Sequence, residues 1–294
     1  MGRERWNLQD KVILITGGGR GIGAATAAEL SRRGAVPVLA DIDDDAARTA
    51  AESLGGDVLT VHVDVTDLGD CQAAVAAVLA RHGRLDAVWA NAGIGAGGPV
   101  ELMDPEAWTR VVQVNLIGAY NTVRAALPAV IESHGHVAVT ASLASFAHSP
   151  FLSAYAASKA GVEAFADSLR TEVAHQGVTV ASLHPTWIDT DMVREGDTES
   201  DAFARLRQSL RAPFAKTYPL DAVVGLIADS FEQRRSRVFL PGFVRSAYLL
   251  RNALNAGPAL RDQLKVAADL RRLFAEQAKR EGARVASLGS RWSR

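Results

Sequence analysis

The chain has 294 residues, of which 48% are hydrophobic and 22% are charged, so it is long enough to bury a sizeable core. Its only cysteine, Cys71, excludes an intrachain disulfide and a cysteine-rich metal site. The net charge of −1 is unevenly spread, because residues from 231 onward hold 14 Lys or Arg against 5 Asp or Glu, which puts +9 there and leaves −10 on the first 230 residues.

Apolar runs that are typical of strands alternate with helical patterns along most of the chain. Strands are predicted at 11–16, 35–41, 57–64, 85–93, 134–142, 178–185 and 237–242. Helices are predicted at 21–33, 44–54, 67–82, 108–131, 153–176 and 221–232. This alternation indicates βαβ units, so we predict an α/β protein with a doubly wound parallel sheet and helices on both faces.

Residues 1–242 are expected to form a single domain, since no boundary stands out before about residue 240. Within it, the polar and partly helical stretch 186–218 is expected to be a mobile lid. Residues 243–294 are predicted to be a basic, amphipathic helical extension, with one apolar face made of Phe243, Ala247, Leu250 and Leu254. That face suits peripheral contact with an anionic membrane, although packing on the protein's own pocket or on a second subunit is the simpler interpretation.

The start of the chain lacks a signal-peptide pattern, because charged residues lead straight into an apolar strand. A run of about 18 apolar residues, as a membrane-spanning helix needs, is also missing. We therefore expect a cytoplasmic protein.

A glycine-rich stretch, TGGGRGIG from Thr16 to Gly23, joins the first predicted strand to the first helix. Glycines there let the backbone approach a pyrophosphate, and the helix N-terminus offers free N–H groups and the positive end of its dipole. The spacing of Gly17, Gly21 and Gly23 is G-x-x-x-G-x-G, not G-x-G-x-x-G. A tight strand-to-helix turn without a ligand is the alternative interpretation.

Carboxylates end the next two predicted strands. Asp41 stands twenty residues after Gly21, where it can accept hydrogen bonds from both hydroxyls of an adenosine ribose. Its charge would repel a 2′-phosphate, so NAD is favoured over NADP, although Arg20 argues mildly for NADP. Asp64 can accept from an adenine amino group, and the Asn91–Gly93 stretch ends the fourth strand. All these positions lie at carboxyl ends of strands, where open α/β sheets bind ligands.

Together with residues further along, these motifs resemble those of the short-chain dehydrogenase/reductase family, which is NAD(P)-dependent and carries Tyr-x-x-x-Lys. The matching positions are Thr16-Gly17-x-x-x-Gly21-Ile22-Gly23, Asp64, Asn91-Ala92-Gly93, Asn115, Ser142 and Tyr155-x-x-x-Lys159. The resemblance covers about residues 8–242. It implies a Rossmann-type seven-stranded sheet in the order 3-2-1-4-5-6-7, and hydride transfer between NAD and a secondary alcohol or ketone.

The resemblance also implies a set of cofactor contacts. At two positions this sequence departs from the family pattern. The expected contacts are Gly17, Arg20, Gly21, Ile22, Gly23, Asp41, Ile42, Asp64, Val65, Asn91, Ala92, Gly93, Tyr155, Lys159, Ile188 and Thr190. Pro185-Thr186 stands where the family often has Pro-Gly, although Thr190 still matches the carboxamide-binding threonine. Ser145 stands where a glycine usually follows the catalytic serine by three residues. Both departures bear on the substrate more than on the reaction.

The predicted catalytic residues are Asn115, Ser142, Tyr155 and Lys159. Tyr155 and Lys159 are four residues apart on a predicted helix and share one face. A free tyrosine has a pKa of about 10, and a nearby ammonium lowers that pKa by stabilising the phenolate. Tyr155 can then take the alcohol proton or donate it in the reverse direction, while Ser142 orients the substrate oxygen. The resemblance implies that Lys159 binds the nicotinamide ribose and that Asn115 holds a water linking Lys159 to solvent.

Each of these residues also has a simpler interpretation when taken alone. A Tyr-x-x-x-Lys pair is usually a solvated helix face, and a serine after a strand is usually a cap. Asn115 is equally explained as a buried polar group satisfied by backbone. These interpretations would all have to coincide with the glycine-rich turn, so we favour catalysis.

A substrate pocket is predicted around Ser145, Phe146, Phe151, Trp187 and Met192, which suits a lipophilic or ring-bearing alcohol or ketone. Ordinary core packing is the alternative for each of these side chains. His134 and His136 have no third ligand at metal spacing, so no metal is predicted. No nucleic-acid partner is expected, and the resemblance implies a homodimer or homotetramer.

Two other functions stay open on the sequence. An NADPH-dependent ketoreductase is opposed by Asp41. A non-catalytic dinucleotide-sensing or scaffold protein could lose Tyr155 or Lys159 without penalty, so their presence argues against it. The substrate and the favoured direction are not indicated.

Overall fold

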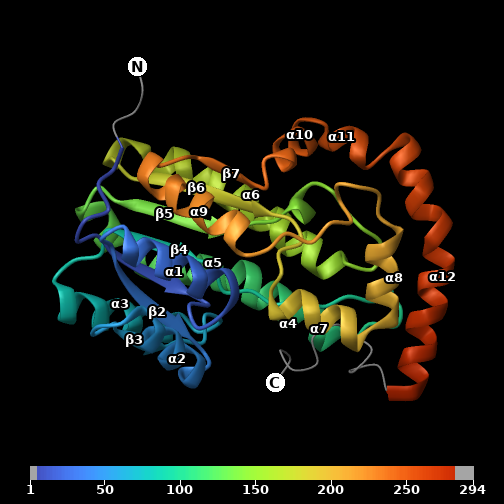
Figure 1. The fold of residues 1–294 in the computed structure, drawn as a ribbon, viewed down its shortest axis with the longest axis horizontal. Helices are drawn as coiled ribbons and strands as arrows, with labels where there is room; N and C mark the ends of the chain where they lie inside the picture. The colour runs from blue at the N-terminus through green and yellow to red at the C-terminus, as the bar shows by residue number, and fades with distance from the viewer. Residues whose placement is uncertain (1–4, 282–294) are drawn as a thin grey trace.

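Seven parallel strands form one sheet in the order β3-β2-β1-β4-β5-β6-β7 in the computed structural model, which describes residues 5–281 (Figure 1). The strands are β1 (Val12–Thr16), β2 (Val36–Asp41), β3 (Thr60–His62), β4 (Ala87–Ala90), β5 (His136–Thr140), β6 (Thr179–Pro185) and β7 (Arg237–Leu240). The order and the parallel pairing confirm the predicted fold. The edge strand β3 is much shorter than the predicted range 57–64.

Helices cover both faces of the sheet, as predicted. One face packs against α1 (Gly21–Arg32), α2 (Asp44–Leu54) and α9 (Asp221–Gln233), and the other against α3 (Leu68–His82), α5 (Gly118–Glu132) and α6 (Ser153–Val173). Strand β1 shows the reason, because successive side chains of a strand point to opposite faces. Val12 and Leu14 join the core under α3, α5 and α6, whereas Ile13 and Ile15 join the core under α1 and α9.

The single helix predicted at 108–131 is instead interrupted by a π-helical turn. The segment consists of α4 (Pro105–Val112), the π-helical turn (Gln113–Ile117) and α5. Asp104 caps α4, since its carboxylate accepts a hydrogen bond from the Glu106 N–H. The π-helical turn carries Asn115, whose side chain is buried. Such turns often mark functional sites, and this one lies next to the cavity described below.

The stretch predicted as a lid contains two short helices beyond the carboxyl ends of the strands. They are α7 (Asp191–Glu199) and α8 (Asp201–Ser209), and they meet at Ser200 (Figure 1). The mobility of this stretch stays a prediction. We call α7 and α8 the lid helices below.

The C-terminal extension is helical as far as residue 281, and residues 282–294 of the predicted extension lie outside the described part. Its helices are α10 (Phe243–Leu249), α11 (Arg251–Leu254) and α12 (Gly257–Glu281), and α12 packs along α8 (Figure 1). The predicted apolar face was wrong in detail, because Val244 and Ala247 are buried whereas Leu250 is 61% exposed. Helix α10 ends at Leu249, so the helical period does not continue through Leu250.

The buried side chains of α10 contact the chain itself, which is the simpler of the two interpretations above. Val244 and Ala247 pack against Leu143 and Phe146 of the segment that follows β5. Between residues 5 and 281, no helix combines the length and the apolar character needed to cross a membrane.

Candidate active site

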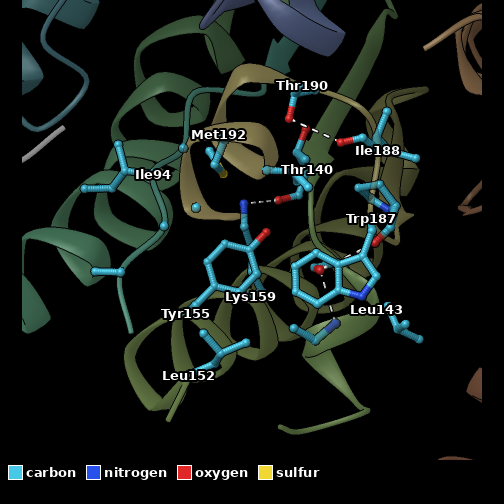
Figure 2. A pocket seen from close by; sticks show the side chains of 18 of the residues that line it. Ile94, Thr140, Leu143, Leu152, Tyr155, Lys159, Trp187, Ile188, Thr190 and Met192 are labelled. Carbon is cyan, nitrogen blue, oxygen red and sulfur yellow. Dashed lines mark hydrogen bonds between the residues drawn. The ribbon is translucent and has the colours of Figure 1, made fainter. Parts of the chain in front are cut away.

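A cavity of about 680 Å³ lies at the carboxyl ends of the central strands, where the sequence predicted the site. Its walls come from the glycine-rich turn, the ends of β2, β4, β5 and β6, helix α6, the lid helices and the C-terminal extension. Figure 2 shows the part of the cavity around Tyr155, Lys159 and Trp187. The predicted site residues that line it are Gly17, Arg20, Gly21, Ile22, Asp41, Ile42, Asp64, Val65, Asn91, Ala92, Gly93, Ser142, Tyr155, Lys159, Trp187, Ile188, Thr190 and Met192.

The glycine-rich turn is packed too closely to accept a side chain at Gly17 or Gly23. Gly17 has φ +63°, and a Cβ there would lie 2.9 Å from the Cα of Ala92. A Cβ on Gly23 would lie 2.2 Å from the Gly17 carbonyl oxygen, so Gly23 supports the turn from behind and does not line the cavity. No side chain caps the N-terminus of α1 at Arg20. The first N–H groups of this helix therefore remain for an anionic ligand, which fits the pyrophosphate of a dinucleotide.

Asp41 holds the loop around the cavity through its carboxylate. Its Oδ2 accepts a hydrogen bond from the Gly19 N–H at 2.9 Å, and its Oδ1 accepts from the Asp43 N–H at 3.1 Å. Arg20, the residue that argued for NADP, forms an ion pair with Asp43. The negative charge of Asp41 thus lies at the cavity wall, while a second carboxylate partly neutralises the nearby guanidinium.

Short polar contacts join the ends of β1, β4 and β5. The amide of Asn91 donates to the Thr16 carbonyl at 3.0 Å and to the Gly17 carbonyl at 3.2 Å. Thr140 donates to Asn91 Oδ1 at 3.1 Å and accepts from the Trp89 indole at 2.9 Å. The Asn91–Gly93 motif therefore fixes the floor of the cavity as well as lining it.

Asp64 also lines the cavity, and its carboxylate stays charged. Burial opposes ionisation, but hydrogen bonds from the N–H and hydroxyl of Thr66 and the charge of Arg110 outweigh burial and lower the pKa of Asp64. The Thr66 hydroxyl donates to Asp64 Oδ1 at 2.7 Å, and Arg110 lies 3.4 Å from Oδ2. Oδ2 therefore makes the longer contact, and the contact of Asp64 with an adenine amino group stays a prediction.

Tyr155, Lys159 and Ser142 converge on the cavity from two elements. Tyr155 and Lys159 come from α6, and Ser142 follows β5. Lys159 Nζ donates to the Thr140 carbonyl at 2.8 Å and lies 5.7 Å from the centre of the Tyr155 ring, as Figure 2 shows. The Ser142 hydroxyl donates to the Pro185 carbonyl at 3.4 Å, and it faces the Tyr155 phenol closely enough to lower the pKa of that phenol. A substrate oxygen between these hydroxyls would reach a proton donor or acceptor and a second polar contact.

The pKa values of the pair differ from the simple expectation. Burial raises the pKa of the Tyr155 phenol, and the polar Ser142 hydroxyl offsets only part of that rise. Burial lowers the pKa of the Lys159 ammonium to about 8. The pKa of Tyr155 therefore stays above its ordinary value even though the Lys159 ammonium lies 5.7 Å from the centre of its ring, because burial is the larger effect.

Asn115 acts through the backbone around the cavity. Its Oδ1 accepts from the Ile94 N–H at 2.8 Å, and its Nδ2 donates to the Ile94 carbonyl at 3.0 Å and to the Ser158 hydroxyl at 3.1 Å. Asn115 does not line the cavity, although a Cβ placed on Gly93 would be 3.2 Å from its Oδ1. The side chain thus positions the loop beside Lys159, and its predicted link to a water stays a prediction.

Three of the five predicted substrate-pocket residues do not line the cavity. Ser145 is buried behind Ser142, where its hydroxyl accepts from the Ser142 N–H at 3.2 Å and donates to the Lys159 carbonyl at 2.9 Å. Phe146 packs on Tyr248 at 5.3 Å, and Phe151 packs on Phe274 at 5.5 Å. Both aromatics meet the C-terminal extension, a contact that the local sequence did not show. Trp187 and Met192 do line the cavity.

A second layer of residues around the cavity was not predicted from the sequence. His184 is fully buried behind Ser142, with Nδ1 3.3 Å from the Ser142 carbonyl oxygen and Nε2 3.0 Å from the Ser182 hydroxyl. The apolar wall opposite the glycine-rich turn includes Leu152, Phe203, Leu206 and Val266. The only sequence feature that pointed to Val266 was the helical spacing of apolar residues in the extension. That spacing does not reveal which part of the protein the helix packs against.

Comparisons with known proteins agree with this geometry. The sequence model for short chain dehydrogenases matches residues 11–201. The chain is 36% identical over 201 residues to trans-4-hydroxycyclohexanecarboxylate dehydrogenase of Sinomonas cyclohexanicum, covering 65% of this chain and 78% of the relative. It is 34% identical over 209 residues to (-)-trans-carveol dehydrogenase of Rhodococcus erythropolis, covering 65% of this chain and 76% of the relative.

A solved structure shows the same fold. The short-chain dehydrogenase/reductase of Burkholderia phymatum in complex with NAD superimposes with a TM-score of 0.75 at 27% identity, covering 86% of this chain and 98% of that chain. The uncapped N-terminus of α1, the glycine-rich turn and Asp41 fit a dinucleotide of this kind. Among residues 5–281, no group of three or more His, Cys, Asp or Glu could hold a metal ion.

Proposed function

Because the chain belongs to the short-chain dehydrogenase family and is an oxidoreductase acting on CH–OH groups, we propose that it transfers a hydride between NAD and a lipophilic, ring-bearing secondary alcohol or ketone. Tyr155 is the general acid and base. The observation that carries the proposal is the convergence of Tyr155, Lys159 and Ser142 on a cavity whose other end presents the Asp41 carboxylate. When bound, oxidised NAD would supply the hydride acceptor and a positive charge in this cavity.

The chain's own residues then handle the proton. In oxidation, the Tyr155 oxygen accepts the proton of the substrate hydroxyl, and the Ser142 hydroxyl holds the substrate oxygen in place. Lys159, with a pKa of about 8, is mostly protonated at pH 7 and adds positive charge near the phenolate. In reduction, the Tyr155 hydroxyl returns a proton to the oxygen. Ser145 positions the backbone of Ser142 relative to the backbone of Lys159, because its hydroxyl accepts from the Ser142 N–H and donates to the Lys159 carbonyl.

The preference for NAD rests on charge. A 2′-phosphate would lie against the carboxylate of Asp41, and Arg20 is already paired with Asp43. Like charges in contact oppose binding, so NADP is disfavoured. We expect kcat/KM to be higher with NADH than with NADPH when both are measured with the same ketone.

The substrate class rests on the cavity wall and on two relatives. Apolar side chains near Tyr155 include Leu143, Leu152, Trp187 and Met192 (Figure 2). The names of the two relatives give trans-4-hydroxycyclohexanecarboxylate and (-)-trans-carveol as substrates, and both compounds are ring-bearing secondary alcohols. A ring-bearing alcohol should bind an apolar wall beside the Tyr155 hydroxyl more tightly than a flexible chain of similar size does. The ring loses less conformational entropy on binding.

The test is NADH formation by the purified chain with cyclohexanol, carveol and trans-4-hydroxycyclohexanecarboxylate. The acyclic alcohol 2-octanol serves as the matched control, and NADP replaces NAD in a parallel series. We expect at least one ring alcohol to exceed 2-octanol in kcat/KM, with NAD preferred. A clear NADP preference would restore the ketoreductase alternative. Tight NADH binding without turnover of any alcohol or ketone would favour a non-catalytic dinucleotide sensor.

Self-association is proposed from an exposed apolar face. Ile117 and Tyr120 are 44% and 46% exposed, and Tyr120 packs edge-on to Phe165 of α6 at 6.2 Å. Exposed aromatic and aliphatic side chains on neighbouring helices suit an interface between two copies of the chain. Light scattering that gives the mass of a monomer at micromolar concentration would contradict this part of the proposal.

A further inference from the structure

Helix α12 carries one inward face at helical spacing, formed by Gln263, Val266, Leu270, Phe274 and Gln277. Leu270, Phe274 and Gln277 are 0%, 2% and 4% exposed, so most of this face is buried against the rest of the chain. Nearer the start of the helix, Gln263 and Val266 line the cavity. The extension that the sequence predicted as a separate basic segment is therefore part of the cavity wall.

At one end of this face, a buried amide joins α12 to the junction of the lid helices. Gln277 Nε2 donates to the carbonyl of Glu199, at the end of α7, at 3.0 Å. Gln277 Oε1 accepts from the Ser200 hydroxyl at 3.1 Å, and Ser200 Oγ in turn accepts from the Phe203 N–H that begins α8. One side chain of the extension thus fixes the end of α7 and the cap of α8 together.

Two further amides join the extension to the segment that follows Ser142. Asn255 Nδ2 donates to the Phe146 carbonyl at 2.7 Å, and Asn255 Oδ1 accepts from the His148 N–H at 3.1 Å. Gln263 Nε2 donates to the His148 carbonyl at 2.9 Å. The backbone between β5 and α6 is therefore held by side chains more than 100 positions away in the sequence.

Between these amide contacts, apolar packing runs from α12 to the reacting end of the cavity. Leu270 shares a buried cluster with Leu152, Phe203 and Leu206. Phe203 packs edge-on to Trp187 with ring centres 5.5 Å apart. Trp187 lies beside Tyr155 in Figure 2. A change on α12 can therefore reach the substrate position through two layers of side chains.

We propose that the C-terminal extension is a specificity-determining wall of the substrate cavity, in which Val266 limits the size of the substrate ring and Gln277 holds the lid helices in place. The substituents of a ring alcohol, on the side away from its hydroxyl, lie against Leu152, Leu206 and Val266. This inference rests on the proposed function for the identity of the substrate, but not for the contacts that hold the lid helices.

The size role is tested by Val266→Phe, with Leu264→Phe as the matched control. Leu264 is on the same helix and 64% exposed, so its replacement adds an aromatic ring outside the cavity. We expect the ratio of kcat/KM for carveol to kcat/KM for cyclohexanol to fall about tenfold in Val266→Phe, because carveol carries an isopropenyl group that must share this space. The ratio should not change in Leu264→Phe. An equal loss for both alcohols in Val266→Phe would overturn the size role.

The holding role is tested without substrate or cofactor by hydrogen–deuterium exchange on the full chain. Gln277→Met keeps the volume of the side chain but removes both amide contacts, and Glu276→Gln is the control at an exposed neighbour. We expect amides of residues 191–209 to exchange at least about tenfold faster in Gln277→Met, with residues 16–23 unchanged, since local opening follows the contacts that are lost. Unchanged exchange in 191–209 would overturn the holding role.

A second variant separates this outcome from general unfolding. Gln263→Met removes the contact to His148 and should speed exchange at residues 146–152 rather than at 191–209. Faster exchange over the whole chain in both variants would overturn the proposal, because it would show a contribution to stability without local specificity. If the wild-type chain oxidises no ring alcohol, the proposed function fails, while the exchange data still decide whether the extension holds the lid helices.

Discussion

The two ends of the cavity are lined by different kinds of protein groups. The end that fits a dinucleotide consists of backbone and short side chains, in which a Cβ on Gly17 would lie 2.9 Å from Ala92 and the Asn91 amide is 3.0 Å from the Thr16 carbonyl. The substrate end consists of longer side chains from α6, the lid helices and α12. The first end tolerates few residue types, whereas the second can change its shape through single side chains without altering the sheet.

Loss of the phenol should have the largest effect on activity and should leave the dinucleotide end intact. We expect Tyr155→Phe to lower kcat by about 10²–10⁴-fold, because the variant lacks the group that accepts or donates the proton. NADH binding, followed by its fluorescence, should change little. If turnover persists at the wild-type rate across active substrates, Tyr155 is not the acid and base.

Acid should destabilise the layer behind Ser142. Burial lowers the pKa of His184 to about 4 from an ordinary 6.5, so between those values the unfolded chain binds more protons than the folded chain. Stability is therefore lost as the pH falls through this window, by about 3 kcal/mol from this histidine. His184→Phe keeps an aromatic ring but cannot titrate.

The expected result is a difference between two denaturant curves. The wild-type free energy of unfolding minus that of His184→Phe should fall by about 3 kcal/mol from pH 6.5 to pH 4. Using the difference cancels the carboxylates that are far from His184, but not Glu163, whose carboxylate lies 3.8 Å from His184 Nδ1 and meets a different ring in the variant. A difference that stays constant with pH would show that His184 is not held neutral by burial.

Glycine substitutions should change the free energy of unfolding in opposite directions in the glycine-rich turn and in helix α9. Gly23→Ala places a Cβ 2.2 Å from the Gly17 carbonyl oxygen, and we expect it to cost about 1–3 kcal/mol through overpacking. Gly225→Ala, inside α9 with nothing within 4 Å of the new Cβ, should instead stabilise the chain by up to about 1 kcal/mol. Urea unfolding measures both, and equal effects would contradict the close packing of the turn.

The smallest expected effect concerns the choice of dinucleotide. Asp41→Asn keeps one oxygen, which can accept from either the Gly19 or the Asp43 N–H, and removes the charge. We expect the NADPH to NADH ratio of kcat/KM to rise about tenfold, which is about 1.4 kcal/mol, because the site is partly open to solvent and salt screens the charge. Asp45→Asn, at a side chain that is 89% exposed, is the control and should leave the ratio unchanged.

The family resemblance predicted the sheet order, and most of the predicted catalytic and cofactor residues line the cavity, whereas most of the predicted substrate-pocket residues do not. Asp41 and Asp64 were placed correctly because each ends or follows a strand of a parallel sheet, whose carboxyl ends share one edge. Phe146 and Phe151 were misplaced because their partners, Tyr248 and Phe274, are more than 100 residues away. No local pattern distinguishes an aromatic side chain in a pocket from one packed on a distant helix.

The sequence by itself determined the fold, the glycine-rich turn and the pair of Tyr155 and Lys159, since each depends on local period or on steric limits that few residue types meet. Only the tertiary structure decided that Ser145 bridges Ser142 and Lys159, that Val266 lines the cavity and that Gln277 contacts the end of α7. The physical reason is that these positions depend on how whole helices pack against each other. Packing of that kind sums many contacts between distant segments, and no short motif encodes it.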